Sequence, residues 1–266
     1  MSDRPTDIRS YVKWLRDVHG VPIDPATRNY YDVATRAMRD HLGRSKFWQD
    51  LVTQLPEYDA QYLSKCSVYL LMSPTQPLEA KIKPFDSVLD KSFRKNVLEN
   101  GGFPQAPDLG WIFPSNWLLR LNDIVRTSIA VKYLDGVTFL VERVGDLANA
   151  TGVSAQIDYE AREEGYYAAH VCALLPAEIP NAKWDTERIE FSLEVQITTQ
   201  MQEAIRVLTH PFYTQRRSAA PDPRHKWQWD YASDEFRANY LAHTLHHIEG
   251  LIMDIRARGG KKDDEP

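Results

Sequence analysis

The sequence has few cysteines, no long apolar run and no apolar N-terminal segment. Its only two cysteines, Cys66 and Cys172, lie in apolar runs. Two cysteines cannot form a framework of several disulfides, so we interpret them as small buried residues of a reduced compartment. No stretch approaches the ~18 apolar residues that a membrane helix needs, and the N-terminus lacks the apolar core of a signal peptide. We therefore expect a cytoplasmic protein without a membrane partner.

The chain also lacks an excess of basic charge. Its 266 residues include 32 basic and 37 acidic side chains, which give a formal net charge of −5. This balance argues against nonspecific nucleic-acid binding over the whole surface, although it is compatible with a local basic patch. The hydrophobic fraction of 43% is ordinary for a globular fold with a sizeable core.

Hydrophobic periodicity divides the chain into helical ends and a mixed central region. Apolar residues at helical spacing predict three helices in an N-terminal extension, residues 1–66. Residues 67–215 alternate β-rich runs with helices and form the predicted central domain. Residues 216–233 are predicted to be a Pro-rich, basic linker, and residues 234–266 a long helix with a disordered tail. We therefore predict an α/β fold, a mixed β-sheet flanked by helices, with helical extensions at both ends.

Within the central region, short β-rich runs alternate with helical patterns. Extended segments are predicted at 66–72, 78–85, 124–132, 155–159, 165–175 and 188–198. Helices are predicted at 86–98, 135–150 and 200–210. Residues 101–116 contain three glycines and three prolines, which predict a long loop with a functional or mobile role.

The clearest alternation in the sequence lies in residues 189–199. Apolar side chains occupy one parity, and Ser192, Glu194, Gln196 and Thr198 occupy the other. Successive side chains of a strand point to opposite faces, so one face would pack on the core while the other presents a carboxylate and an amide. An ordinary half-exposed strand has the same pattern.

Lys83, Ser87 and Lys91 follow one another at steps of four residues. If a helix begins near Asp86, Ser87 and Lys91 share a face beside the free N–H groups of the first turn. Backbone donors, the helix dipole and lysine charges would together favour a polyphosphate. A solvated helix face has the same spacing.

Two further segments carry candidate site residues. Asp123 stands at the entrance to a predicted strand, where a metal ligand and a simple turn residue are both found. Tyr166 and His170 share one face of another predicted strand, on which an aromatic ring and an imidazole could hold a nucleobase and its phosphates. A buried tyrosine beside a hydrogen-bonded core histidine gives the same pattern.

The order of these motifs resembles the synthetase domain of the RelA/SpoT family, the pyrophosphokinases that make hyperphosphorylated nucleotides. The resemblance covers about residues 79–213. The family's motifs run from a basic cluster through a strand-start aspartate and a Gly-Tyr…His segment to Glu-Val/Ile-Gln-Ile-x-Thr. They are matched here by Lys81, Lys83, Ser87 and Lys91, by Asp123, by Gly165, Tyr166 and His170, and by residues 194–199.

The resemblance implies a sheet of the nucleotidyltransferase type and a pyrophosphokinase activity. Such an enzyme transfers the β,γ-pyrophosphate of ATP to the 3′-hydroxyl of a guanosine nucleotide and makes (p)ppGpp-type alarmones. By this resemblance, Asp123 and Glu194 bind Mg²⁺, and Glu194 also accepts the proton of the hydroxyl. The implied ATP-binding residues are Lys81, Lys83, Ser87, Lys91 and Arg126, and the implied acceptor-binding residues are Tyr166, His170 and Gln196.

Four positions depart from the family pattern and leave the acceptor open. Lys81, Ser128 and Thr198 stand where arginines are usual, and Arg126 stands where glycine is expected. These departures look like the small and toxic branches of the family. Alternatives are therefore an adenosine nucleotide or the 3′ end of tRNA as acceptor, in a growth-inhibiting toxin with an antitoxin partner. No His-Asp dipeptide occurs, so we expect synthesis without hydrolysis.

Other functional interpretations remain open from the sequence alone. A catalytically inactive nucleotide-binding module is the rival from another functional class. Two basic groups would suit tRNA, namely Arg36, Arg39, Arg44 and Lys46, and Arg206, Arg216, Arg217, Arg224 and Lys226. His243 and His247 have the spacing of zinc ligands on a helix but no identified third ligand. The aromatic segment 227–231 either packs the last helix on the body or forms a partner surface.

Overall fold

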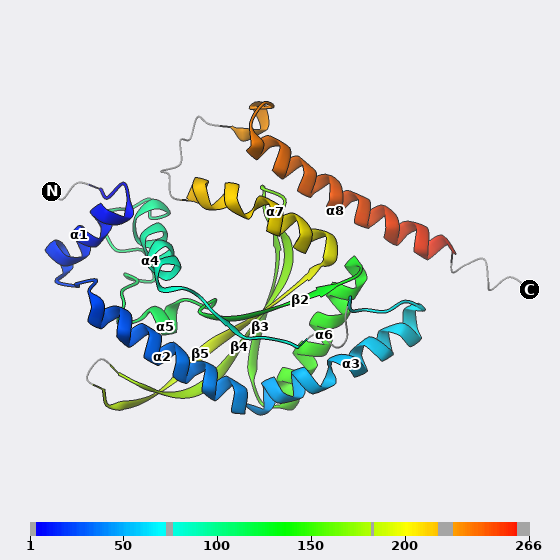
Figure 1. The fold of residues 1–266 in the computed structure, drawn as a ribbon, viewed down its shortest axis with the longest axis horizontal. Coiled ribbons are helices and arrows are strands. Elements are labelled where there is room, and N and C mark those ends of the chain that lie inside the picture. The colour runs from blue at the N-terminus through cyan, green and yellow to red at the C-terminus, as the bar shows by residue number, and fades with distance from the viewer. Residues whose placement is uncertain (1–3, 73–76, 182–183, 218–225, 260–266) are drawn as a thin grey trace, which may run out of the picture.

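The structure is a computed structural model of the chain, and it describes residues 4–72, 77–181, 184–217 and 226–259. Three helices precede the sheet, as the sequence predicts: α1 (Ile8–His19), α2 (Pro25–Arg44) and α3 (Lys46–Cys66) (Figure 1). Each begins at a residue whose side chain accepts a backbone N–H of the first turn, which satisfies one free donor of the helix.

The extended run predicted for residues 66–72 is wrong over most of its length. The helix α3 continues to Cys66 and ends at Ser67, whose φ of 57° lies in the left-handed region. Only Leu71 makes a β-bridge, with Val131. Buried Asp59 holds this segment, because its Oδ1 accepts the Leu71 N–H at 2.8 Å. The apolar composition of the run therefore reflects burial rather than pairing with a neighbouring strand.

Five strands form one mixed sheet in the order β1-β2-β5-β4-β3. They are β1 (Lys81–Ile82), β2 (Val125–Val131), β3 (Ser154–Ala161), β4 (Tyr167–Pro180) and β5 (Thr186–Thr199). The strands β2 and β5 are parallel, and every other pair in this sheet is antiparallel. The predicted mixed α/β fold with helical extensions is confirmed.

The remaining helices connect the strands or follow the sheet. They are α4 (Phe85–Phe93), the π-helical turn η1 (Arg94–Leu98), α5 (Trp117–Arg120), α6 (Leu134–Ala150), α7 (Gln200–Arg217), the 3₁₀ turn η2 (Trp227–Trp229) and α8 (Asp234–Gly259). The predicted end of α7 at His210 is wrong, since the helix continues to Arg217. Pro211 lies inside this helix, where a proline removes one backbone hydrogen bond and crowds the preceding turn but does not always end the helix. Part of the predicted linker and the predicted disordered tail lie outside the described residues.

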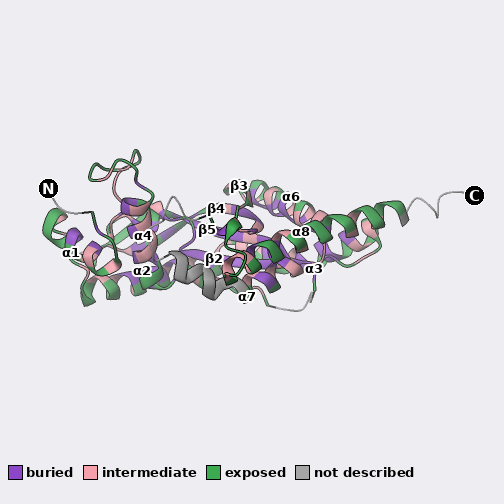
Figure 2. Ribbon diagram, turned by 90° about the horizontal axis from the view of Figure 1, so that it is seen from above, coloured by how far each residue is buried: buried purple, intermediate pink, exposed green. Residues whose placement is uncertain are grey.

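The two faces of the sheet differ in chemistry. The apolar parity of β5, Leu193, Val195 and Ile197, is fully buried in the main core. The helices α2 and α6 pack against the strands, and α3 packs against α6. Figure 1 shows α2 and α3 on one side of the sheet and α4, α7 and α8 on the other. Buried residues follow the strands and the inward sides of the helices (Figure 2). The polar parity of β5 therefore faces the side of α4, α7 and α8.

Among the described residues, no helix is both long and apolar enough to cross a membrane.

A buried polar network joins α1 and η1 to the predicted loop at residues 101–116. The side chain of Asn96 donates to the Ile112 carbonyl at 2.8 Å and accepts the Ile112 N–H at 2.9 Å. It also donates to the Tyr11 hydroxyl at 2.7 Å, and Tyr11 lies 2.8 Å from the hydroxyl of Ser92. Asn96 and Ser92 are fully buried, so the network holds the far end of the loop against the body.

Asn96→Ala should destabilise the fold, because it leaves the buried Ile112 N–H without its acceptor, whereas Ser92 still donates to the Ile112 carbonyl. We expect the free energy of unfolding to fall by about 1–3 kcal/mol, measured by urea denaturation. The matched control is Asn29→Ala, at an exposed position of α2, which should change it by less than about 0.5 kcal/mol. Equal urea midpoints for the two variants would contradict this account of the network.

Candidate functional site

Polar side chains of four strands lie in two rows on one face of the sheet. In the first row, Arg126 pairs with Glu194, Glu194 with Cys172, and Cys172 with Gln156. Residues directly opposite one another on neighbouring strands share a face. The second row is Ser128, Gln196, His170 and Asp158. The polar alternation of β5 therefore continues across the sheet as a polar floor.

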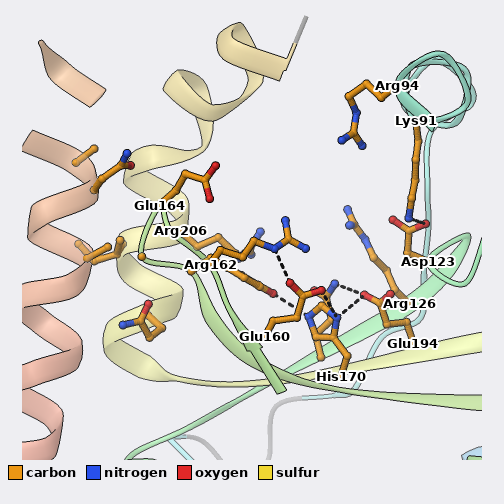
Figure 3. A pocket seen from close by; sticks show the side chains of 18 of the residues that line it. Lys91, Arg94, Asp123, Arg126, Glu160, Arg162, Glu164, His170, Glu194 and Arg206 are labelled. Atoms are coloured by element: carbon orange, nitrogen blue, oxygen red, sulfur yellow. Dashed lines mark hydrogen bonds and ion pairs between the residues drawn. The ribbon is translucent and has the colours of Figure 1, made fainter. Parts of the chain in front are cut away.

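This polar floor lies beneath two adjoining cavities of about 510 and 410 Å³. The larger one lies between the sheet, α4, α7 and α8, and Figure 3 shows the side chains that converge on it. The smaller one reaches Ile112 and Arg120 in the segment before β2. The two cavities share Lys91, Lys95, Glu160, His170 and Glu194. The shared wall places Glu194 and Lys91 between two spaces, each large enough for a small molecule.

Lys83, just before α4, and Lys91, within α4, both contact Asp123. Lys83 Nζ lies 2.7 Å from Asp123 Oδ2, and Lys91 Nζ lies 2.8 Å from Asp123 Oδ1. The Lys83 N–H also donates to the Ile124 carbonyl at 2.8 Å, which fixes the start of α4 beside the start of β2. The side chains of Lys83 and Asp123 are only 10% and 12% exposed. Two ammonium groups on one carboxylate leave a local charge of +1 in the wall of the larger cavity.

The electrostatics of this cluster follow from burial and from its composition. Burial acts to raise the pKa of Asp123, but the charges of Lys91 and Lys83 outweigh it and hold that pKa well below its usual range. Burial lowers the pKa of Lys83, and the attraction of Asp123 opposes this effect. We therefore treat Asp123 as ionised across the neutral range, with both lysines as its counter-ions.

Glu194 and His170 form the centre of the floor. His170 Nδ1 lies 3.8 Å from Glu194 Oε1 and 3.9 Å from Glu160 Oε1, and Gln196 donates to Glu194 (Figure 3). His170 Nε2 lies 3.0 Å from the Tyr166 hydroxyl. Burial raises the pKa of Tyr166 to about 12, so the phenol is neutral at ordinary pH. His170 thus lies between the two carboxylates and the hydroxyl of Tyr166, with which it shares a hydrogen bond.

The structure brings most of the predicted site residues to this cavity. Its lining includes Lys83, Lys91, Asp123, Arg126, Tyr166, His170, Glu194 and Gln196. Two predicted residues are not in the lining of either cavity. Lys81 is exposed on the edge strand β1, opposite Arg126, and Ser87 is exposed in the first turn of α4. Ser87 and Lys91 stand one turn apart within α4, as predicted, but only the long side chain of Lys91 reaches Asp123 and the cavity.

Sequence reasoning missed several lining residues. Arg94 and Lys95 stand three and four positions after Lys91, a helical spacing that would have revealed them. Glu160 and Arg162 come from the end of β3 and the turn after it, and Gln202 comes from α7. Asn239 belongs to α8, far along the chain. Only the strand register and the packing of helices bring these four residues to the site, and neither has a local sequence signal.

The histidines of α8 have structural contacts with β4. His243 Nδ1 lies 2.8 Å from the Tyr167 hydroxyl, and its Nε2 lies 2.8 Å from the Glu163 carbonyl. His246 stacks on the Tyr167 ring with centroids 3.6 Å apart, whereas His247 is exposed. In the described part of the chain, no group of three or more His, Cys, Asp or Glu is arranged to hold a metal ion. These contacts fix α8 on the body.

The aromatic segment before α8 and the two basic groups each contain residues in different surroundings. Trp227 is buried and packs on Tyr240, whereas Trp229 and Tyr231 are 86% and 79% exposed. Arg206 lines the larger cavity. The side chains of Arg216, Arg217 and Arg224 lie outside the described residues. Arg36, Arg39, Arg44 and Lys46 are exposed on α2 and at the start of α3 and line neither cavity.

Known structures share this fold. No family model matches the sequence, and no curated protein matches it in sequence. The small alarmone synthetase 1 from Bacillus subtilis is similar in structure, with a TM-score of 0.54 and 15% identity over 88% of this chain and 97% of that one. The same enzyme bound to its product pppGpp has a TM-score of 0.53 and 14% identity, over 86% of this chain and 96% of that one. A GTP pyrophosphokinase family protein from Streptococcus pneumoniae has a TM-score of 0.53 and 16% identity, over 92% of this chain and 100% of that one. The fold implied by the sequence resemblance is thereby confirmed.

Replacing Asp123 should change how the stability of the fold depends on pH. Its folded pKa is depressed, so ionised Asp123 contributes stability above its unfolded pKa of about 4 and loses it as the pH falls below that value. Asp123→Asn should therefore be less stable than the wild type at pH 7, with a difference that shrinks between about pH 5 and pH 3. Urea denaturation at several pH values measures this, with exposed Asp40→Asn as control. A difference that stays constant with pH would contradict the assignment.

Proposed function

We propose that this chain is a pyrophosphokinase that transfers the β,γ-pyrophosphate of ATP to the 3′-hydroxyl of a nucleotide, with a guanosine nucleotide as the leading acceptor. One observation carries the proposal: the two lysines that hold buried Asp123 and the carboxylate of Glu194 line the same cavity. The fold is that of a small alarmone synthetase and of a GTP pyrophosphokinase family protein, and the former has been seen with pppGpp. The order of the motifs along the sequence gives independent support.

In the proposed reaction, the 3′-oxygen of the acceptor forms a bond to the β-phosphorus of ATP. The bond from that phosphorus to the oxygen bridging it to the α-phosphorus breaks, and AMP leaves. The proton of the attacking hydroxyl passes to the carboxylate of Glu194, which is 7% exposed and keeps its orientation through Gln196. No covalent intermediate is needed, so the protein acts by positioning the substrates and by neutralising charge.

The basic wall of the cavity would hold the ATP phosphates. Each lysine ammonium has three N–H donors, and one donor on Asp123 leaves two for phosphate oxygens. Asp123 thereby fixes Lys83 and Lys91 before the nucleotide arrives. Arg126, opposite Glu194 in the sheet, adds a donor fork close to the same place. Arg94 and Lys95 of η1 lie in the same lining, where Glu99 pairs with both of them.

The carboxylates of Asp123 and Glu194 fit a magnesium ion. Mg²⁺ usually binds through one or two carboxylates together with substrate phosphates and water, and this cavity combines two carboxylates with a basic wall for phosphates. A carboxylate has about four lone-pair positions, so Asp123 can keep its two lysines and still offer an oxygen. When bound, the ion neutralises charge on the polyphosphate.

Tyr166, His170 and Gln196 would hold the acceptor. The hydrogen bond between the Tyr166 hydroxyl and His170 fixes the ring at the larger cavity, and a nucleobase stacking on an aromatic ring gains ~1–3 kcal/mol. His170 and Gln196 lie in the row next to Glu194 and would orient the sugar and phosphates.

Of the two basic groups that would suit tRNA, only the second reaches the larger cavity in the described part of the chain, through Arg206. The exposed basic residues of α2 and α3 line neither cavity, so they give no path for a polyanion that leads to Glu194. An adenosine nucleotide and the 3′ end of tRNA therefore remain alternative acceptors, which the assay below tests. An antitoxin partner remains a separate alternative. The inactive module is disfavoured because Asp123, Glu194 and both lysines are present together in one cavity.

The proposal is tested by incubating the purified chain with Mg²⁺ and ATP labelled in the β-phosphate, with GDP, GTP, ADP or deacylated tRNA as acceptor. We expect label to pass to GDP and GTP, with AMP released in equal amount. Transfer to ADP alone or to tRNA alone would favour an alternative acceptor. The absence of transfer to every acceptor would refute the pyrophosphokinase.

Glu194→Gln and Asp123→Asn should each reduce the transfer rate by about 100-fold or more, because they remove the base and the anchor of the lysines. The matched control for Glu194 is Glu142→Gln, at an exposed position of α6, which should keep the wild-type rate. Circular dichroism checks that each variant is folded. A fully active Glu194→Gln enzyme would contradict the assigned role.

A further inference from the structure

The turn between β3 and β4 carries two side chains of the larger cavity, Arg162 and Tyr166. The Arg162 N–H donates to the Tyr166 carbonyl at 3.0 Å, and the Gly165 N–H donates to the Arg162 carbonyl at 2.9 Å. The φ of Gly165, 83°, lies in the region that favours glycine, and a Cβ there would stand 2.7 Å from the Ala242 Cβ of α8. Because the turn is closed by its own backbone and α8 packs directly on it, Arg162 and Tyr166 have a fixed backbone position.

Glu160 is turned toward the two cavities, although its strand lies at the edge of the sheet. Most residues of β3 are exposed, but Glu160 is partly buried and lines both cavities. It pairs with Ala168 of β4, whose side chain is small. A long side chain also reaches the diagonal neighbours on the partner strand. For Glu160 these neighbours are Tyr166 and His170, the aromatic ring and the imidazole that we assign to the acceptor.

Glu160 contacts both sides of this pair through separate oxygens (Figure 3). Its Oε2 accepts a hydrogen bond from Arg162 Nε, and the guanidinium carbon of Arg162 lies 5.2 Å from the centroid of the Tyr166 ring. A guanidinium within about 6 Å of a ring centroid is attracted by the aromatic face. The other oxygen, Oε1, lies 3.9 Å from His170 Nδ1. One carboxylate therefore holds Arg162 over Tyr166 and also lies beside His170.

The position of Arg162 restricts how a base can stack at this site. Its guanidinium covers one face of the Tyr166 ring, so a base stacks on the opposite face. Glu160 matches the charge of Arg162. The guanidinium therefore stays on the ring and does not turn toward the phosphates of a ligand in the same cavity.

We propose that Glu160 is a positioning residue for the acceptor, which holds Arg162 against Tyr166 and thereby fixes the ring face on which the acceptor base stacks. Glu160 itself needs no contact with the acceptor. It is not among the motif residues that carry the family resemblance. This inference rests on the proposed function, and it holds for either purine, because every base has a face that can stack.

The test measures kcat and KM for whichever of GDP and ADP the wild type uses, together with the KM for ATP. The variants are Glu160→Ala, Arg162→Ala and the double variant. Each single variant should raise the KM for the acceptor about tenfold, because the ring loses its fixed orientation, while kcat and the KM for ATP change less than about twofold. The double variant should be no worse than the single ones, because the two residues act as one unit. Factors that multiply in the double variant would overturn the proposal.

Glu160→Gln separates positioning from folding. It keeps the size of the side chain and an oxygen that can accept the Arg162 N–H without the charge, so it should raise the acceptor KM only about threefold. The matched control is Asp254→Ala, which removes an ion pair with Arg258 on α8 that lines neither cavity and should leave both KM values unchanged. Thermal unfolding is followed for every variant. Calorimetric binding of the acceptor without ATP gives an affinity that does not depend on transfer.

The outcomes distinguish the two proposals. An acceptor KM that stays unchanged in Glu160→Ala and Glu160→Gln overturns the role of Glu160 and leaves the pyrophosphokinase intact. A lower kcat with a parallel rise in both KM values and a lower unfolding midpoint indicates a purely structural role and also overturns it. No transfer to any acceptor by the wild type overturns the proposed function and this inference with it.

Discussion

The site depends on one buried carboxylate that two lysines share. Asp123 stands immediately before β2, and its two oxygens hold Lys83 and Lys91, on either side of the first turns of α4. An ammonium group that is largely removed from water needs a partner, and removal of the partner is far more costly than the pair is worth. The cluster therefore fixes α4 against the sheet and maintains positive charge above Glu194. The same two ion pairs therefore set both the position of α4 and the positive charge of the site.

Over residues 191–199, β5 is largely buried on both parities, for two different reasons. Its apolar side chains are buried in the main core, and its polar ones are buried beneath the helices that enclose the cavities. Glu194 and Thr198 are each 7% exposed, although alternation alone would make them solvent-facing. Polar groups inside a protein are retained where they have partners, and here the neighbouring rows of the sheet supply them. The closed surroundings strengthen every charge interaction at the floor.

The sequence was informative where a signal is local. The alternation of β5 indicated the polar parity that contains Glu194, and the strand and helix patterns located β2 and α6 within one residue. Lys83 and Lys91 were found from their spacing and lie together. Ser87 lies one turn before Lys91 in α4 but is exposed, because spacing predicts a shared face and not whether a short side chain at the first turn reaches the cavity.

Long-range placement had no comparable signal. The parallel register that sets Arg126 opposite Glu194, the antiparallel one that sets His170 opposite Gln196, and the position of α8 over Gly165 all join segments far apart in sequence. The run at 66–72 was taken for a strand because buried irregular chain and buried strand have the same apolar composition. Only the tertiary contacts of such a segment distinguish the two.

The parallel pairing of β2 with β5 also constrains the order of assembly. The strands β3, β4 and β5 follow one another and pair as neighbours, so they can form through short connections. By contrast, β2 ends at Val131 and its partner β5 begins only at Thr186. Closing this long loop costs more chain entropy than closing a hairpin, so the pairing comes late in folding. During synthesis, the lysine cluster and Asp123 emerge from the ribosome well before Glu194, and a nascent chain shorter than β5 has the basic half of the site but not its acidic floor.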